Sequence, residues 1–104
     1  MHIISYKKIR EFCGKHTAAV KPLNHWYRIV KHEEFKVFTD IKQLFPSADK
    51  VGNFVIFNIG GNKYRLIAFI HYQMNRLFIR HIMTHKEYDK GKWKEDKWFN
   101  YTKN

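Results

Sequence analysis

The sequence predicts a small α+β domain, in which two N-terminal helices pack on an antiparallel sheet of three to four strands. Two observations support this fold class. Apolar residues in the first 31 positions recur at helical spacing, and residues 54–59, 64–72 and 77–83 are rich in β-branched and aromatic side chains. Turn-forming residues separate these three runs, so we expect the strands to form an antiparallel meander.

The length and composition indicate one globular domain. The chain has 104 residues, of which 44% are hydrophobic and 17% aromatic, which excludes a disordered chain. It shows no internal repeat or interdomain linker. We therefore expect a single domain over residues 1–104, with a basic, aromatic C-terminal segment from about residue 90.

The first expected elements are an edge strand and a helix. Residues 2–4 are apolar and could join the sheet as an edge strand. From residue 6 to about residue 15, Ile9, Phe12 and Cys13 share one helix face, and Gly14 favours an end nearby.

A second helix follows, with Thr17 as a candidate cap and Pro22 early in the helix. Its apolar stripe has the spacing i, i+3, i+4 and i+7 and consists of Leu23, Trp26, Tyr27 and Val30. Residues 39–45 are expected to form a short helix that Pro46 ends, and residues 47–53 a loop.

The two hairpins of the meander determine which side chains meet. Gly60 and Gly61 favour the first turn, and residues 74–75 are expected at the centre of the second. A two-residue second turn would place Arg65 opposite Thr84, and a bulge would place it opposite His85. In both registers Arg65 lies beside residues 84–86.

Strand alternation predicts the two faces of the central strand. Arg65 shares a face with Ile67, Phe69 and His71, whereas Tyr64, Leu66, Ala68 and Ile70 occupy the other. We expect the helices to cover one sheet face and to leave the other partly open, which would suit single-stranded RNA.

The C-terminal segment allows two interpretations. It mixes lysines with four aromatic residues, Trp93, Trp98, Phe99 and Tyr101. These could form a tail that stacks on bases and binds phosphates, or they could pack back on the body of the domain.

The chain is strongly basic: it has 20 Lys and Arg residues but only 9 Asp and Glu residues, which gives a net charge of +11. Such a field favours a polyanionic partner, although an anionic membrane surface would also attract it. There is no signal-peptide pattern and no apolar run of membrane-spanning length. The lone Cys13 forms no intrachain disulfide, so we expect a cytoplasmic protein without a membrane partner.

The motifs of several other enzyme classes are absent. The sequence has no Gly-Lys-Ser phosphate loop, no Gly-x-Gly-x-x-Gly and no pair of histidines at helical spacing on one expected helix. We therefore expect no metal and no cofactor. His81 is interpreted as a histidine of the core or sheet face.

Metal-free acid–base cleavage of RNA remains, because RNA carries its own nucleophile in the 2′-hydroxyl. Histidine suits the proton transfers, arginine holds phosphate oxygens, and a tyrosine or lysine could serve if its pKa were lowered. These residue types occur around Arg65 and His85. A surface arginine beside a solvated histidine is the alternative.

Two stretches resemble the HigB family of bacterial toxins. They are N-I-G-G-N-K-Y-R-L-I-A at residues 58–68 and I-R-H-I-M-T-H-K-E-Y-D at residues 79–89. Residues 45–49 and 54–57 are similar too, so the likeness covers about residues 35–89.

The resemblance implies a RelE-type fold and a ribosome-dependent mRNA endonuclease, which acts on mRNA in the ribosome and contacts ribosomal RNA. It also implies a helix-turn-helix antitoxin of the HigA type, with operator DNA bound only through that antitoxin. The family's arginine at the start of the central strand falls on Arg65. Its polar cluster falls on His85, Lys86 and Tyr88.

In the resulting hypothesis, Arg65 stabilises the charge on the pentavalent phosphorane, and His85 acts as general acid or base. Tyr88 completes the acid–base pair or stacks on a base. RNA would be bound by Asn62, Lys63, Arg80 and Lys86. The alternatives are a non-catalytic RNA-binding module and an interaction domain for an acidic protein.

Overall fold

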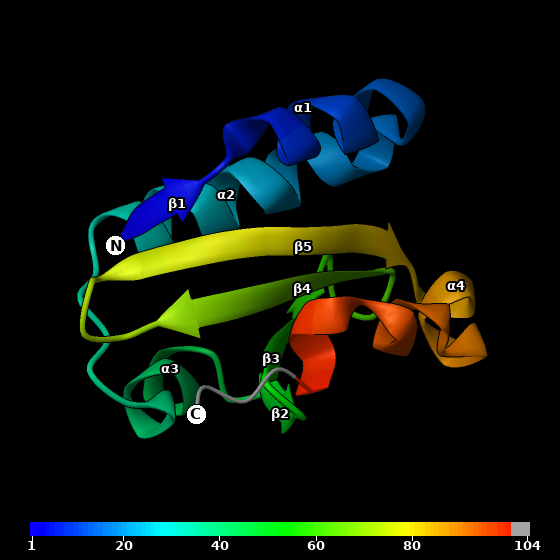
Figure 1. The fold of residues 1–104 in the computed structure, drawn as a ribbon. Helices are drawn as coiled ribbons and strands as arrows, with labels where there is room; N and C mark the ends of the chain where they lie inside the picture. Colours follow the sequence, from blue (N-terminus) through cyan, green and yellow to red (C-terminus); the bar gives the residue numbers. More distant parts are fainter. Residues whose placement is uncertain (101–104) are drawn as a thin grey trace.

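The computed structural model describes residues 1–100 and has an α+β architecture built on one five-stranded sheet (Figure 1). The strand order is β1-β5-β4-β3-β2. The strands are β1 (His2–Ile4), β2 (Asp49–Val51), β3 (Phe54–Ile59), β4 (Tyr64–His71) and β5 (Arg76–Thr84). The α-helices are α1 (Tyr6–Lys15), α2 (Val20–Lys31), α3 (Phe38–Leu44) and α4 (His85–Lys90). Three 3₁₀ turns, η1 (Thr17–Ala19), η2 (Lys92–Glu95) and η3 (Lys97–Asn100), complete the described residues.

The expected meander of β3, β4 and β5 is confirmed, but the sheet is larger than predicted and mixed. β1 is the predicted edge strand and pairs in parallel with β5. β2 lies within the predicted loop of residues 47–53 and pairs with β3. Three residues are too few to show an alternating pattern, so the sequence did not reveal β2.

The predicted register of the second hairpin is wrong. His71 faces Arg76, so the turn contains four residues instead of two. A bulge at Arg80 of β5, opposite Ile67 and Ala68 of β4, then moves the pairing by one residue, and Arg65 faces Met83. Arg65 nevertheless stays close to the end of β5, because its neighbour Tyr64 pairs with Thr84.

The first three helices form where they were expected, but two of their N-termini differ in detail, and α4 was not predicted. Thr17 does not cap α2; it begins η1, and α2 starts without a side-chain cap. α3 starts one residue before its predicted beginning, and Asp40 accepts hydrogen bonds from the backbone N–H groups of Lys36 and Val37. A carboxylate inside the first turn thus satisfies backbone donors just before the helix, which is one half of a capping box.

The two faces of the sheet have separate apolar clusters, and the predicted alternation along β4 is confirmed. Tyr64, Leu66, Ala68 and Ile70 belong to the cluster under α1 and α2. Ile67 and Phe69 belong to a second cluster on the opposite face. Within residues 1–100, no helix is long and apolar enough to cross a membrane.

The second face is not open as predicted, because the C-terminal residues 92–100 pack across it (Figure 1). We call these residues the C-terminal strap. Trp93, Trp98 and Phe99 join the second apolar cluster, which confirms the interpretation that the aromatics pack back on the body. Tyr101 lies outside the described residues.

Candidate active site

The turn between β3 and β4 places two exposed polar residues at the start of the central strand. Gly60 and Gly61 both have positive φ angles, 63° and 68°, which a residue with a Cβ atom adopts only with strain. The turn leads into Asn62 and Lys63, which are exposed. These two residues therefore lie directly beside Arg65.

Arg65 is buried, with 7% of its surface exposed. Its Nη2 donates to Asn62 Oδ1 at 2.6 Å, and its Nη1 donates to the carbonyl oxygens of Asn62 and Tyr64 at 3.3 and 3.2 Å. Within residues 1–100, no carboxylate lies within ion-pair distance of this guanidinium. The described partners of the guanidinium are thus uncharged oxygens, which do not neutralise its positive charge. The guanidinium is therefore suited to bind an anion such as phosphate.

His85 is positioned by a capping box at the start of α4. The Thr84 hydroxyl accepts from the Glu87 N–H, and the Glu87 carboxylate accepts from the Thr84 N–H, each at 3.2 Å. The His85 N–H donates to the carbonyl of Lys63 at 3.0 Å, which ties α4 to the β3–β4 turn. His85 Nδ1 lies 3.3 Å from Asp89 Oδ2, one helical turn away, so Nε2 is left for chemistry.

Tyr88 contacts both Arg65 and the C-terminal strap. The Arg65 guanidinium carbon lies over its ring at 5.5 Å from the ring centroid. The ring also stacks on Trp93, with centroids 5.0 Å apart and planes at 9°. Burial, followed by the charges of Asp49 and Asp89, raises the pKa of Tyr88 although Arg65 opposes the shift.

This direction is opposite to the lowered pKa that a tyrosine base would need. The Tyr88 phenol keeps its proton at neutral pH, so it can donate a proton or a hydrogen bond.

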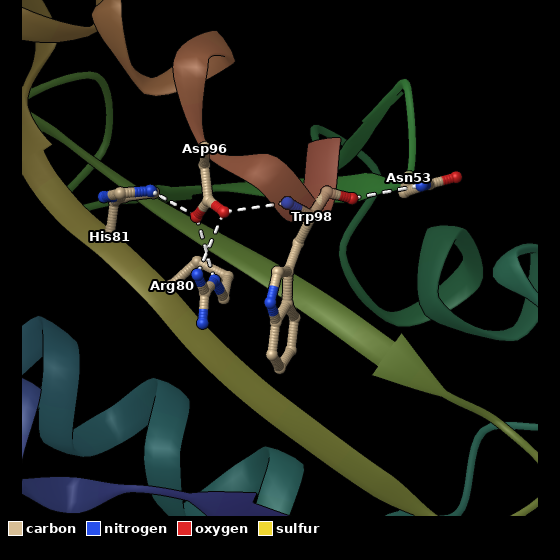
Figure 2. A network of polar contacts seen from close by, with 5 residues as sticks. All are labelled: Asn53, Arg80, His81, Asp96 and Trp98. Carbon is tan, nitrogen blue, oxygen red and sulfur yellow. Dashed lines mark hydrogen bonds and ion pairs between the residues drawn. The ribbon is translucent and has the colours of Figure 1, made fainter. Parts of the chain in front are cut away.

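Arg80, which was predicted to bind RNA, is held by the strap. Its Nε and Nη2 both donate to the Asp96 carboxylate at 2.9 Å, and its guanidinium covers the Trp98 ring at 3.9 Å (Figure 2). His81 Nε2 lies 2.8 Å from the same carboxylate. Adjacent strand residues normally point to opposite faces, but the bulge falls at Arg80 and lets both reach Asp96.

The structure therefore brings together most of the predicted site residues. We define the Arg65 corner as the polar group at the shared end of β4 and β5: Asn62, Lys63, Arg65, His85, Lys86 and Tyr88. Lys86 is exposed on α4. Arg80 is engaged by Asp96, and His81 is half-buried beside it on the sheet face.

Two neighbours of the corner were not predicted from the sequence. Asp89 pairs with His85, and Trp93 stacks on Tyr88. The signal for Asp89 was present, since the Thr84-x-x-Glu87 capping box predicts a helix that places residues 85 and 89 on one face. Trp93 had no comparable local signal. Among the described residues, no group of three or more His, Cys, Asp or Glu side chains could hold a metal ion.

Comparison with known proteins connects this geometry to a family. A family profile described as HigB_toxin, RelE-like toxic component of a toxin-antitoxin system, matches residues 19–91. The mRNA interferase HigB of Escherichia coli O6:H1 (strain CFT073) is 33% identical over 93 residues, which cover 86% of this chain and 90% of that protein. The chain belongs to the HigB family.

Further HigB-family relatives give the same picture. The mRNA interferase toxin HigB of Escherichia coli K12 is 32% identical over 92 residues, covering 86% of this chain and 88% of that protein. The mRNA interferase HigB of Shigella flexneri has the same identity and coverage. As a family of toxic components of toxin–antitoxin systems, HigB proteins have an antitoxin as partner. The family match ends at residue 91, directly before the strap.

Proposed function

We propose that this HigB-family protein is an mRNA interferase, an endoribonuclease that cuts mRNA in the ribosome and so inhibits translation. The observation that carries the proposal is the buried Arg65, whose charge no carboxylate neutralises within residues 1–100. It adjoins a His85–Asp89 pair and a protonated Tyr88. The printed names of the relatives describe mRNA interferases, which supports the same activity.

The proposed reaction uses the RNA's own 2′-hydroxyl as nucleophile. His85 Nε2 takes the hydroxyl proton, while Asp89 holds Nδ1 and so favours the imidazole tautomer with a free Nε2. The 2′-oxygen attacks the adjacent phosphorus, and Arg65 stabilises the charge that develops on the phosphoryl oxygens.

Tyr88 supplies the second proton transfer. It donates its phenolic proton to the departing 5′-oxygen, a role for which the phenol is in the required protonated state. The products are a 2′,3′-cyclic phosphate and a free 5′-hydroxyl. Protonated His85 and deprotonated Tyr88 then return to their starting states by proton exchange with water.

The exposed residues of the corner provide the RNA contacts in this proposal. Lys63 and Lys86 attract phosphates, whereas Asn62 orients Arg65, whose Nη2 donates to its Oδ1. Arg80 is not among these contacts, because the Asp96 carboxylate binds two of its nitrogens and neutralises its charge.

The proposed partners follow from the activity and the family. They are mRNA in the ribosome, the ribosomal RNA around it, and a helix-turn-helix antitoxin of the HigA type through which operator DNA is bound. An enzyme that acts on translating ribosomes works in the cytoplasm.

The test is primer extension on a reporter mRNA in a reconstituted translation reaction, with a ribosome-free control. We expect cuts only on translated message, and a loss of about 10²-fold or more in cleavage rate for His85→Ala and for Arg65→Ala. His25→Ala is the matched control, because His25 is exposed on α2 and should cleave as wild type does.

Full cleavage by both corner variants would disprove the assignment of the site. If wild type arrests translation without cutting, the protein is instead a non-catalytic RNA-binding module.

A further inference from the structure

We propose that Trp93 is a positioning residue, which holds Tyr88 and, through Tyr88, the guanidinium of Arg65 in the geometry for cleavage. This inference deepens the proposed function and rests on it. It assigns a role in the reaction to the C-terminal strap, which begins after the last residue of the family match.

Trp93 constrains Tyr88 at two points. The indole and phenol rings stack with planes at 9°, which restricts the plane of the Tyr88 ring. The indole Nε1 also donates to the backbone carbonyl of Tyr88 at 3.0 Å. One contact holds the side chain and the other holds the end of α4, so the ring cannot turn without losing the stack.

α4 cannot hold Tyr88 by itself. The helix has six residues, none of them buried, and short helices depend on packing for stability. Its N-terminus is held by the capping box of Thr84 and Glu87. Near its C-terminal end, the contact of Tyr88 with Trp93 supplies the packing.

The effect reaches Arg65 through a direct contact. The guanidinium lies over the Tyr88 ring, so a displaced ring removes one side of the arginine's surroundings. Asn62 and the carbonyl of Tyr64 hold the other end of the guanidinium. Tyr88 thus completes the set of contacts that orients a buried cation.

Trp93 is itself rigidly held, which a positioning residue requires. It is 4% exposed and contacts the rings of Phe54 and Phe99. Gly91, with φ at 75°, ends α4 and turns the chain toward the sheet.

The strap is anchored beyond Trp93 as well. Asp96 binds Arg80 and His81 on β5, and the Asn53 side-chain amide donates to the carbonyl of Trp98 (Figure 2). The Asn53 backbone N–H also donates to the carbonyl of Phe99. The Phe99 ring lies so close to Gly52 that a Cβ there would fall 2.6 Å from it.

Three variants of the full-length protein test the proposal. Trp93→Leu fills part of the space without an aromatic plane, and Trp93→Phe keeps a ring but not the N–H donor. Trp98→Leu is the matched control, because it is the same substitution in the same strap and cluster, and the Trp98 ring contacts Phe69 and Phe78 instead of Tyr88.

Cleavage kinetics on translated mRNA should separate positioning from binding. For Trp93→Leu we expect kcat to fall by about 10- to 100-fold with KM within about twofold of wild type, since misplaced catalytic groups slow the reacting step. Trp93→Phe should recover most of kcat. Trp98→Leu should keep kcat while losing thermal stability.

A second readout does not depend on activity. The Arg65 Nε–H resonance in ¹⁵N-resolved NMR spectra senses the ring current of Tyr88. We expect it to move in Trp93→Leu and to stay in place in Trp98→Leu, at a temperature where circular dichroism shows both variants folded.

The outcomes distinguish the two proposals. Equal kcat losses in Trp93→Leu and Trp98→Leu, or an unmoved Arg65 resonance in Trp93→Leu, would overturn the positioning role and leave Trp93 as core packing. If wild type cuts no mRNA, the proposed function fails, while the resonance still reports whether Trp93 orders the corner.

Discussion

At the scale of single residues, the sequence located Arg65 correctly but did not describe its environment. Alternation along β4 placed Arg65 on the face of Ile67 and Phe69, and the structure confirms this. Its burial could not be predicted, because the strap that covers this face follows it by about thirty residues. Nor could its contacts with Asn62, since they depend on the conformation of the β3–β4 turn.

Asn62 and Lys63 are adjacent, and the structure predicts different kinetic effects for them. Asn62 holds the guanidinium of Arg65, so Asn62→Ala should lower kcat by about tenfold with little change in KM. Lys63 is exposed and makes no side-chain contact among the described residues, so Lys63→Ala should mainly raise KM.

Steady-state cleavage of a reporter mRNA by both variants measures the two effects. A rise in KM for Asn62→Ala, with kcat unchanged, would show that Asn62 contacts RNA and does not position Arg65.

At the scale of elements, the bulge in β5 and the helix α4 differ in how far they could be foreseen. The capping box of Thr84 and Glu87 was readable in the sequence and predicts α4. The bulge at Arg80 had no such signal, because a single extra residue changes no periodic pattern over a strand this short. It nevertheless determines that Arg80 and His81 both meet Asp96.

Asp96 should contribute to stability in a pH-dependent way. Burial alone would raise its pKa, but hydrogen bonds from Arg80, Trp98 N–H and His81, with the charge of Arg80, outweigh burial and hold the pKa well below its ordinary value of 3.8. A depressed pKa stabilises the folded state fully above the ordinary value, and this contribution is lost as the pH falls through the folded-state pKa.

We therefore expect Asp96→Asn to lower the free energy of unfolding by about 1–3 kcal/mol near neutral pH, and by less at about pH 3. Urea unfolding at both pH values measures the difference. Glu95→Gln is the control, because Glu95 is the exposed neighbouring acid and should show little effect. A loss for Asp96→Asn that grows as the pH falls would contradict the assigned role of the charged carboxylate.

At the scale of the whole molecule, local sequence patterns predicted the fold class. Contacts between residues far apart in the sequence determined how the second sheet face is covered. The meander, α1 and α2 were readable because their patterns extend over at least six residues each. The packing of the strap on the second sheet face could not be predicted, because in the sequence Trp93 and Trp98 are equally suited to stacking on bases and to burial. The face predicted to be open for RNA is thus partly occupied by the chain's own aromatics.

With that face partly covered, the exposed lysines of the Arg65 corner should carry the electrostatic part of RNA binding. The logarithm of the affinity for unstructured RNA should fall linearly with the logarithm of the salt concentration, at about 0.7 per phosphate contacted. In a His85→Ala background, which prevents cleavage during the titration, Lys86→Ala should reduce this slope by about 0.7.

Lys7→Ala is the control, because Lys7 is exposed on α1, which lies on the other side of the sheet. Fluorescence anisotropy of a labelled RNA at several salt concentrations measures each slope. Equal reductions for Lys7→Ala and Lys86→Ala would mean that RNA responds to the net charge of +11 as a whole. A reduction for Lys86→Ala alone would place phosphates at the Arg65 corner, within reach of the groups proposed to cut the chain.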